Sequence, residues 1–280
     1  MQIGVSMYSY FRPWKEGALD IQAFIHEAKR AGADGVELLS PLYRDVESDR
    51  AAAMQALEET GLTCPIFSAS NNFAQPEPTA RADEFKKVQF AVDEACLYRA
   101  SVVRVFAGDV REGITYEQAR EWIVEGLVNA SIYAEEKGVK LALENHGQLA
   151  GKAEQVLDLI QEVRHFSNSS ALGANPDTGN FLLVDQPSHE AVAKLALHAN
   201  MVHFKDFRPA PEQHEGSAYT SLGGRRYVGA AVGEGTVDLR ACVEALRAQA
   251  FDGWLSVEYE GEESPFDAVP RSIANARTFI

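Results

Sequence analysis

The chain of 280 residues carries 26 basic and 41 acidic side chains, so its formal net charge is −15, which disfavours contact with the phosphate backbone of nucleic acid. The three cysteines, Cys64, Cys96 and Cys242, are far apart and form no C-x-x-C pattern, which argues against a zinc ribbon or a disulfide framework. The chain is 46% hydrophobic, with no secretory signal and no uninterrupted run of about 18 apolar residues, so we expect a large core, no membrane partner and a cytoplasmic location.

Short apolar runs alternate with amphipathic segments, which is the pattern of parallel strands joined by crossover helices. Asp20 precedes one helical pattern as an N-cap, and Thr115 with Gln118 forms a capping-box pattern before another. Glycines mark passages from helix to strand at Gly32, Gly61, Gly138 and Gly253. The predicted strands cover residues 2–8, 35–39, 63–69, 101–106, 139–144, 171–177, 201–206 and 254–258. The predicted helices cover residues 20–32, 49–61, 79–98, 115–138, 152–163, 188–199, 238–249 and 265–279.

Eight strand–helix units in 280 residues average about 35 residues each, which predicts one α/β domain over residues 1–280, a closed (β/α)8 TIM barrel. The length alone also admits two domains, and an open doubly wound sheet is the alternative architecture. No G-x-G-x-x-G follows an early strand, which weakens that alternative. Residues 207–237, rich in Gly, Pro and Ser, interrupt the repeat after strand seven. We predict a lid or substrate loop there and not a linker between domains.

Four successive strands end in a side chain that can bind a metal: Glu144, Asp177, His203 and Glu258. Alternation at period two places each of them opposite the apolar residues of its strand, and the strand ends of a barrel meet at one face. Three carboxylates and one imidazole suit manganese, magnesium, cobalt or zinc. Without a cation the three acids would repel one another. Each acid taken alone fits a barrel salt bridge, and the histidine alone fits a buried core residue, but the ordered set favours a metal site.

The segments LENHG at 143–147, DTGNF at 177–181, HFKD at 203–206 and VEY at 257–259 resemble those of the sugar phosphate isomerase/epimerase superfamily, the xylose-isomerase-like TIM barrels. The likeness extends to GVE at 35–37, RVFAG at 104–108 and GEG at 233–235. It implies that Glu144, Asp177, His203 and Glu258 bind one divalent metal ion, with Mn²⁺ favoured and Mg²⁺, Co²⁺ or Zn²⁺ as alternatives. The superfamily includes ketose 3-epimerases, hydroxypyruvate isomerase, inosose dehydratase, 3-dehydroshikimate dehydratase and endonuclease IV.

The chain departs from two of these patterns. Ketose epimerases carry a histidine where this chain has Asn180, and an arginine further beyond the strand-seven histidine than Arg208 lies. Their substrate contacts therefore do not transfer. Endonuclease IV needs extra histidines on its early strands, but here His26 lies inside a predicted helix, so a nuclease is disfavoured.

Further polar residues near strand ends are candidates for binding a substrate: Tyr8, Glu37, His146, Asn180, Lys205 and Arg208. For His146 a helix-packing role or a hydrogen bond within its loop is an equal alternative. For Lys205 a structural pair with an interior acid such as Glu37 is an equal alternative. Asn71 and Arg104 belong to the same rim of strand ends, where many residues only close the barrel.

Two features of the long loop have competing readings. Arg225, Arg226 and Tyr227 could close over a ligand, although solvated loop charge is the more common role. The GEG pattern at 233–235 could lend backbone N–H groups to a phosphate, but the pattern is short.

These residues predict a metal-dependent isomerase or epimerase that acts on a small sugar or keto-polyol. Its difficult step would be removal of a proton α to a carbonyl, through an enediolate stabilised by the metal. The resemblance implies that one of Glu144 and Glu258 removes the proton and that the other returns it. The alternative is a dehydratase, or another carbon–oxygen lyase, acting on a keto-polyol, keto-sugar or dehydroshikimate-like substrate. Schiff-base chemistry at Lys205 and a binding protein without catalysis are weaker readings, and association into a homo-oligomer is left open.

Overall fold

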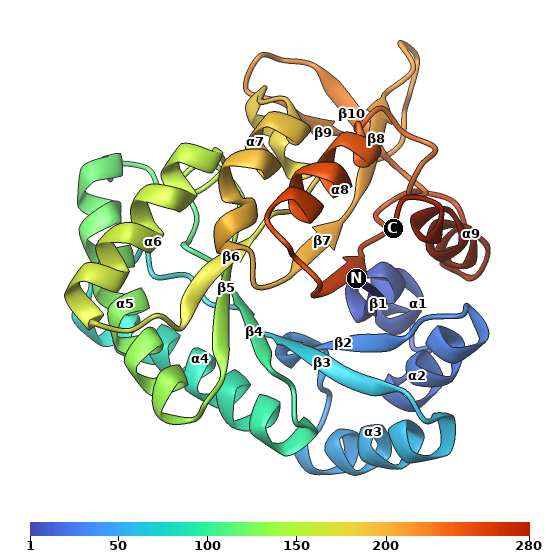
Figure 1. Ribbon diagram of the computed structural model, residues 1–280, viewed down its shortest axis with the longest axis horizontal. Coiled ribbons are helices and arrows are strands. Elements are labelled where there is room, and N and C mark those ends of the chain that lie inside the picture. The colour runs from blue at the N-terminus through green and yellow to red at the C-terminus, as the bar shows by residue number, and fades with distance from the viewer.

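A barrel of eight parallel strands forms the centre of the computed structural model, which describes residues 1–280 (Figure 1). The strands pair in the order β6-β5-β4-β3-β2-β1-β11-β7. Their bounds are β1 (Gln2–Ser6), β2 (Gly35–Leu39), β3 (Thr63–Ser68), β4 (Val102–Val105), β5 (Lys140–Glu144), β6 (Leu172–Asn175), β7 (Val202–Phe204) and β11 (Trp254–Val257). The predicted (β/α)8 barrel is therefore confirmed.

Nine helices surround the strands, and most of them form an outer ring (Figure 1). Their bounds are α1 (Phe11–Lys15), α2 (Ile21–Arg30), α3 (Val46–Thr60), α4 (Pro78–Tyr98), α5 (Tyr116–Glu136), α6 (Ala153–Ser167), α7 (Ser188–Leu195), α8 (Leu239–Ala248) and α9 (Pro265–Arg277). The predicted caps are present: Asp20 accepts the N–H of Ala23 at 2.8 Å, and Thr115 and Gln118 form a capping box. None of the helices combines the length and the apolar composition needed to cross a membrane.

The interior of the barrel is layered. Ile66, Val102, Ala142 and Met201 form a small apolar cluster against Trp254, separate from the main core between strands and helices. Further along the strands the buried side chains become polar, and they include Glu37, Arg104, Glu144 and His203. The apolar cluster closes one end of the barrel and leaves the polar layer facing the other end, where strand ends and loops meet.

The barrel closes without a continuous ladder between β6 and β7. Two isolated bridges, Ala174 to Ala199 and Asp177 to His203, join the two edges. Thr178 adds a backbone bond to the carbonyl of His203 at 3.0 Å, and its hydroxyl both accepts the N–H of Lys205 and donates to the carbonyl of Lys205. We call this junction the β6–β7 seam.

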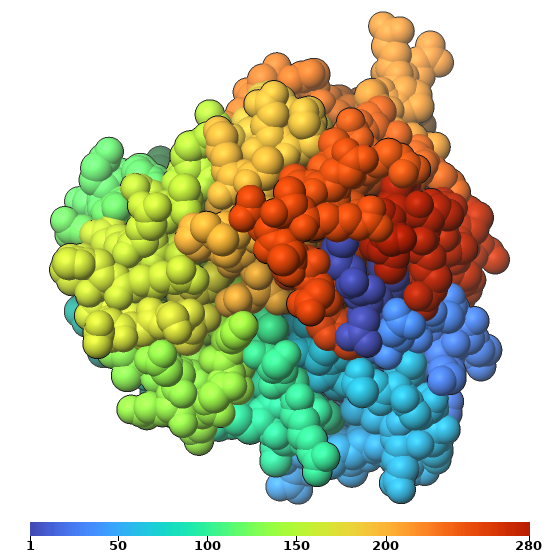
Figure 2. Space-filling view, in the orientation of Figure 1, coloured from blue at the N-terminus to red at the C-terminus, as the bar shows by residue number.

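The segment 207–237 is more regular than the sequence indicated. Together with Asp206 it contains a three-stranded antiparallel sheet of β8 (Asp206–Pro209), β10 (Arg226–Ala230) and β9 (Tyr219–Thr220), in the order β8-β10-β9. Part of it projects from the outline of the molecule at the upper right of the space-filling view (Figure 2). The first predicted strand also ends early, at Ser6, because a 3-10 turn over Met7–Tyr10 and then α1 follow it.

Candidate metal centre

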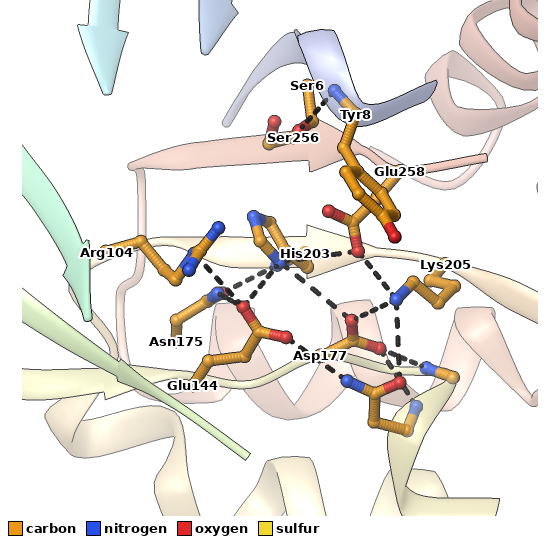
Figure 3. Close-up of polar contacts among 12 residues, drawn as sticks. Ser6, Tyr8, Arg104, Glu144, Asn175, Asp177, His203, Lys205, Ser256 and Glu258 are labelled. Carbon is orange, nitrogen blue, oxygen red and sulfur yellow. Dashed lines mark hydrogen bonds and ion pairs between the residues drawn. The ribbon is translucent and has the colours of Figure 1, made fainter. Parts of the chain in front are cut away.

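The four predicted ligands come together at the polar end of the barrel. Glu144 ends β5, Asp177 lies two residues beyond β6, His203 is the middle residue of β7, and Glu258 directly follows β11. One donor atom of each residue lies within 4.8 Å of the others, and all four side chains are buried (Figure 3). Because the parallel strands end at one face of the barrel, they bring Glu144 and Glu258 together although these residues are more than 100 positions apart in the sequence.

The orientation of His203 is fixed by Glu37 behind it. The Nε2 atom of His203 lies 3.1 Å from both carboxylate oxygens of Glu37, so Nε2 carries a hydrogen and donates it. Ser68 and Ser256 donate their hydroxyls to the same carboxylate. Burial would raise the pKa of Glu37, but the charge and hydrogen bond of His203 outweigh it and lower this pKa to about 2.

The second ring nitrogen of His203 faces the other three ligands. Its Nδ1 atom is buried and has no hydrogen-bond partner, while Glu144 Oε2 lies at 3.2 Å, Glu258 Oε2 at 3.8 Å and Asp177 Oδ2 at 3.9 Å. A lone pair surrounded by carboxylate oxygens is repelled unless a proton or a cation lies between them. Burial lowers the pKa of His203, but Glu37, Glu258 and Glu144 outweigh it and hold this pKa well above its ordinary value. The donor set therefore fits a divalent cation, with hard oxygen ligands and one imidazole.

Two asparagines hold the ligands in place. Asn145 accepts the backbone N–H of Asp177 at 2.6 Å and donates to its carbonyl at 3.1 Å. Asn175 accepts the backbone N–H of His203 at 2.8 Å, and its amide lies 3.5 Å from Glu144 Oε2. Sequence reasoning gave these asparagines no role, although each lies within two residues of a predicted ligand. Such supporting contacts orient metal ligands and tune their affinity.

Lys205 lies among three carboxylates. Its Nζ is 2.6 Å from Glu258 Oε2, 2.8 Å from Glu260 Oε1 and 2.9 Å from Asp177 Oδ2 (Figure 3 shows the first and the last). Burial lowers the pKa of Lys205, but these carboxylates outweigh it and hold this pKa well above its ordinary value. Lys205 thus pairs with interior acids, as the structural alternative expected, but not with Glu37, because His203 occupies that carboxylate. Glu260 was missed, although it shares the alternation of Glu258 two residues earlier.

The two carboxylates predicted to act as acid and base differ in their surroundings. Burial raises the pKa of Glu258 to about 7, against the opposing charges of Lys205 and His203. Burial also raises the pKa of Glu144, but the charges of His203 and Arg104 outweigh it and lower this pKa. The Nε of Arg104 lies 3.3 Å from Glu144 Oε2.

A cavity of about 800 Å³ opens over the candidate metal centre and is lined by two of its four residues, Glu144 and Glu258. Four of the six predicted substrate-binding residues line it: Tyr8, His146, Asn180 and Lys205. Asn180 is nearly buried and its amide nitrogen lies 3.2 Å from Glu144 Oε1. The ring of His146 packs against Phe106, with the ring centroids 4.7 Å apart.

The remaining two candidates do not line this cavity. Glu37 is fully buried beneath His203, so it has no route to a substrate and serves as the partner of the imidazole. Arg208 is exposed on β8 and lines a separate, smaller cavity beside Glu262 and Glu263, because the antiparallel sheet leads β8 away from the barrel mouth.

Other rim and loop candidates are mostly structural. Arg104 lines the cavity, but Asn71 uses its amide to bind both backbone groups of Phe106. Arg225 pairs with Asp185, and Tyr227 is buried.

The segment 207–237 reaches the cavity through three other residues, Tyr219, Thr220 and Leu222. The N–H groups of Gly233 and Gly235 donate to Asp206, so they are not free to hold a phosphate.

Comparisons with known proteins show which family the chain resembles. An inosose dehydratase from Clostridium perfringens (strain 13 / Type A) is 27% identical over 91% of this chain and 87% of its own length. Other inosose dehydratases match over only 50–57% of their own length.

Two solved structures share the fold over the whole chain. A D-tagatose 3-epimerase-like protein has a TM-score of 0.78 at 18% identity, covering 100% of this chain and 97% of its own. The IOLI protein, solved with a zinc atom, has a TM-score of 0.75 at 16% identity, covering 100% and 96%. The sequence also matches the xylose isomerase-like TIM barrel family over residues 25–279, and the chain belongs to that family.

Proposed function

We propose that this protein is a divalent-metal-dependent enzyme that removes a proton α to the carbonyl of a sugar or keto-polyol. The observation that carries the proposal is the set of three carboxylates and one unpartnered imidazole nitrogen, all within 4.8 Å at the base of a large cavity. Glu144, Asp177, His203 and Glu258 would hold the cation, which supplies positive charge beside the carbonyl oxygen as negative charge develops there. Mn²⁺ is the proposed ion.

The positions of two carboxylates favour an isomerase or epimerase. Glu144 and Glu258 both line the cavity and come from β5 and β11, with β6 and β7 between them in the barrel, so they approach a substrate from different sides. One carboxylate removes the α-proton from one face of the substrate, and the other returns a proton to the opposite face of the resulting planar intermediate or to the neighbouring carbon. Tyr8, His146, Asn180 and Lys205 contact the hydroxyl groups of the substrate.

A dehydratase is the second candidate, and it is supported by the similarity to inosose dehydratases. It shares the first proton transfer but then expels the β-hydroxyl as water. The substrate would be a keto-polyol, a keto-sugar or a dehydroshikimate-like compound. The relatives act on an inosose by their names, so an inosose belongs in any panel of substrates.

The test is NMR of keto-sugars and inososes in D₂O with the metal-loaded protein. The proposal predicts loss of the α-proton signal of at least one substrate. An epimerase or isomerase then gives a product with deuterium and no loss of water, whereas a dehydratase gives a product that is lighter by one water. No exchange with any member of the panel, under any of the four cations, would contradict the proposed chemistry.

Two controls connect the exchange to the site. Chelator should abolish it, and Glu258→Gln should strongly slow it, whereas Glu94→Gln should not, because Glu94 is a buried carboxylate of α4 that is bound by Arg50 and lies outside the cavity. Borohydride should leave no adduct on Lys205, because surrounding carboxylates keep its amine charged.

A further inference from the structure

The cavity is much larger than the small sugar that the four ligands would hold. A hexose, packed as densely as a protein interior, fills roughly 200 Å³. The cavity above the ligands holds about 800 Å³. Most of its space therefore lies beyond a sugar ring seated at the metal centre.

The outer part of the cavity carries two apolar surfaces beside exposed polar residues that include His146, Gln148 and Thr220. The polar residues Glu144, Lys205, Glu258 and Glu260 gather at its base. Towards the mouth, one side consists of Tyr8, Phe11 and Trp14, which we call the aromatic wall. The rings of Tyr8 and Phe11 stack with centroids 5.4 Å apart, and those of Phe11 and Trp14 stack at 5.7 Å.

The aromatic wall starts at the metal centre and leads outwards. Tyr8 lies beside Glu258 and Lys205 in the close-up (Figure 3), and the next two rings follow at intervals of three residues through α1. A single sugar ring above the ligands reaches Tyr8 but not the whole of this wall.

A second apolar surface is formed by Leu183, Val184 and Leu222, which we call the leucine rim. The first two follow β6, and Leu222 belongs to the segment after β9, where its backbone N–H donates to the carbonyl of Leu183 at 2.9 Å. Leu222 is 56% exposed, so its side chain has apolar surface that a ligand in the cavity can cover.

We infer that the substrate is a keto-sugar glycoside whose aglycone is an apolar, aromatic group, held between the aromatic wall and the leucine rim. This inference rests on the proposed function for the sugar half and adds a binding site for the other half. The polar base recognises hydroxyl and carbonyl groups, and the two apolar surfaces gain from burying a ring and excluding water. The rings of the aromatic wall already stack on one another, so their edges can contact the face of a flat aromatic group.

The test compares binding of two unreactive probes to the metal-loaded protein by titration calorimetry: phenyl glucoside and methyl glucoside, which share the sugar. We expect the phenyl glycoside to bind at least tenfold more tightly, because the phenyl ring buries much more apolar area than a methyl group. Leu222→Ser and Trp14→Ala should each remove most of this preference while leaving methyl glucoside affinity unchanged within about twofold. Leu222 is exposed, so its replacement does not endanger folding.

Leu197→Ser is the matched control, since Leu197 is a 70% exposed leucine outside the cavity, and it should leave both affinities unchanged. Equal affinity of the wild-type protein for the two probes, or no binding of either at millimolar concentration, would overturn the inference.

Turnover separates this inference from the proposed function. The phenyl and methyl glycosides of one keto-hexose are compared in the deuterium-exchange assay. A phenyl preference in binding without exchange of either substrate would retain the apolar site and contradict the enzyme proposal. Exchange of both keto-glycosides with equal kcat/KM would support the enzyme proposal and contradict the apolar site.

Discussion

Replacement of Glu37 by glutamine tests the hydrogen-bonded support of the metal centre without changing any ligand. Glu37 is fully buried, and the histidine beside it lowers its pKa to about 2, so the variant removes one full negative charge at neutral pH while keeping the shape of the side chain. The imidazole Nε2–H of His203 then donates to a neutral amide oxygen, and its Nδ1 becomes a weaker base and a weaker ligand.

The expected effect can be given in two measurable quantities. Loss of such a hydrogen-bonded carboxylate typically weakens metal affinity by about 10–100-fold, which corresponds to about 1.4–2.7 kcal/mol. At saturating metal, the rise in melting temperature caused by the cation should be smaller by roughly 3–5 °C, taking about 2 °C per kcal/mol for a chain of this size. Titration calorimetry with Mn²⁺ and melting curves with and without the ion measure both.

Glu94→Gln is the matched control for this experiment. Glu94 is also buried and ion-paired, with Arg50, but it lies on α4 and outside the metal centre. This control should lower stability with and without the ion equally and leave the affinity for Mn²⁺ unchanged. Wild-type affinity in the Glu37 variant would refute the role given to this carboxylate, and equal losses in both variants would show that general destabilisation explains the effect.

Three further changes test the scaffold. Gly126→Ala should destabilise the protein by about 1–3 kcal/mol in urea unfolding, although alanine favours helices, because its Cβ would overlap the ring of the buried Phe73; a stabilised variant would show that the ring moves freely. Asp206→Ala should cost about 3 kcal/mol and speed hydrogen exchange in the 233–237 turn, since this carboxylate accepts three backbone N–H groups there, and unchanged exchange would contradict that role. Asp34→Asn should cost at most about 1 kcal/mol at pH 7. The cost should shrink as the pH falls below about 3.8, since a carboxyl whose pKa is lowered on folding contributes stability that is lost as the pH falls; a cost that does not change with pH would refute the ion pair with α9.

The barrel and the convergence of the four candidate ligands could be predicted because each depends on a short local pattern. Period-two alternation and strand ends located Glu144 and Glu258 without knowledge of the neighbouring strands, since all parallel strands of a barrel end at one face. The same logic misplaced Glu37. Alternation shows that this acid faces the barrel interior, but it does not show whether the side chain lines the cavity or lies in the buried layer beneath it. The depth of a side chain in the barrel depends on the register between neighbouring strands, and the pattern of a single strand carries no information on that register.

Features that depend on pairing between distant segments escaped prediction. The antiparallel sheet formed by β8, β9 and β10 has a two-residue strand, Tyr219–Thr220, which is too short to show any periodicity. Its geometry decides that Arg208 points away from the cavity and that Leu222 lines it. The contacts of Lys205 likewise required the position of Glu260, which follows a strand separated from it by more than 40 residues.

The β6–β7 seam has a consequence for how the molecule opens. Two proposed ligands, Asp177 and His203, face each other across this junction, where only isolated bridges and side-chain hydrogen bonds join the strands. A bound cation would link the two edges at the weakest point of the strand ladder, so local unfolding of the barrel would require its release. Amide hydrogens beside the seam, such as those of Thr178 and Lys205, should then exchange more slowly with metal present, while those between β3 and β4 change little. Binding of the cation would therefore control how often the barrel opens locally between β6 and β7.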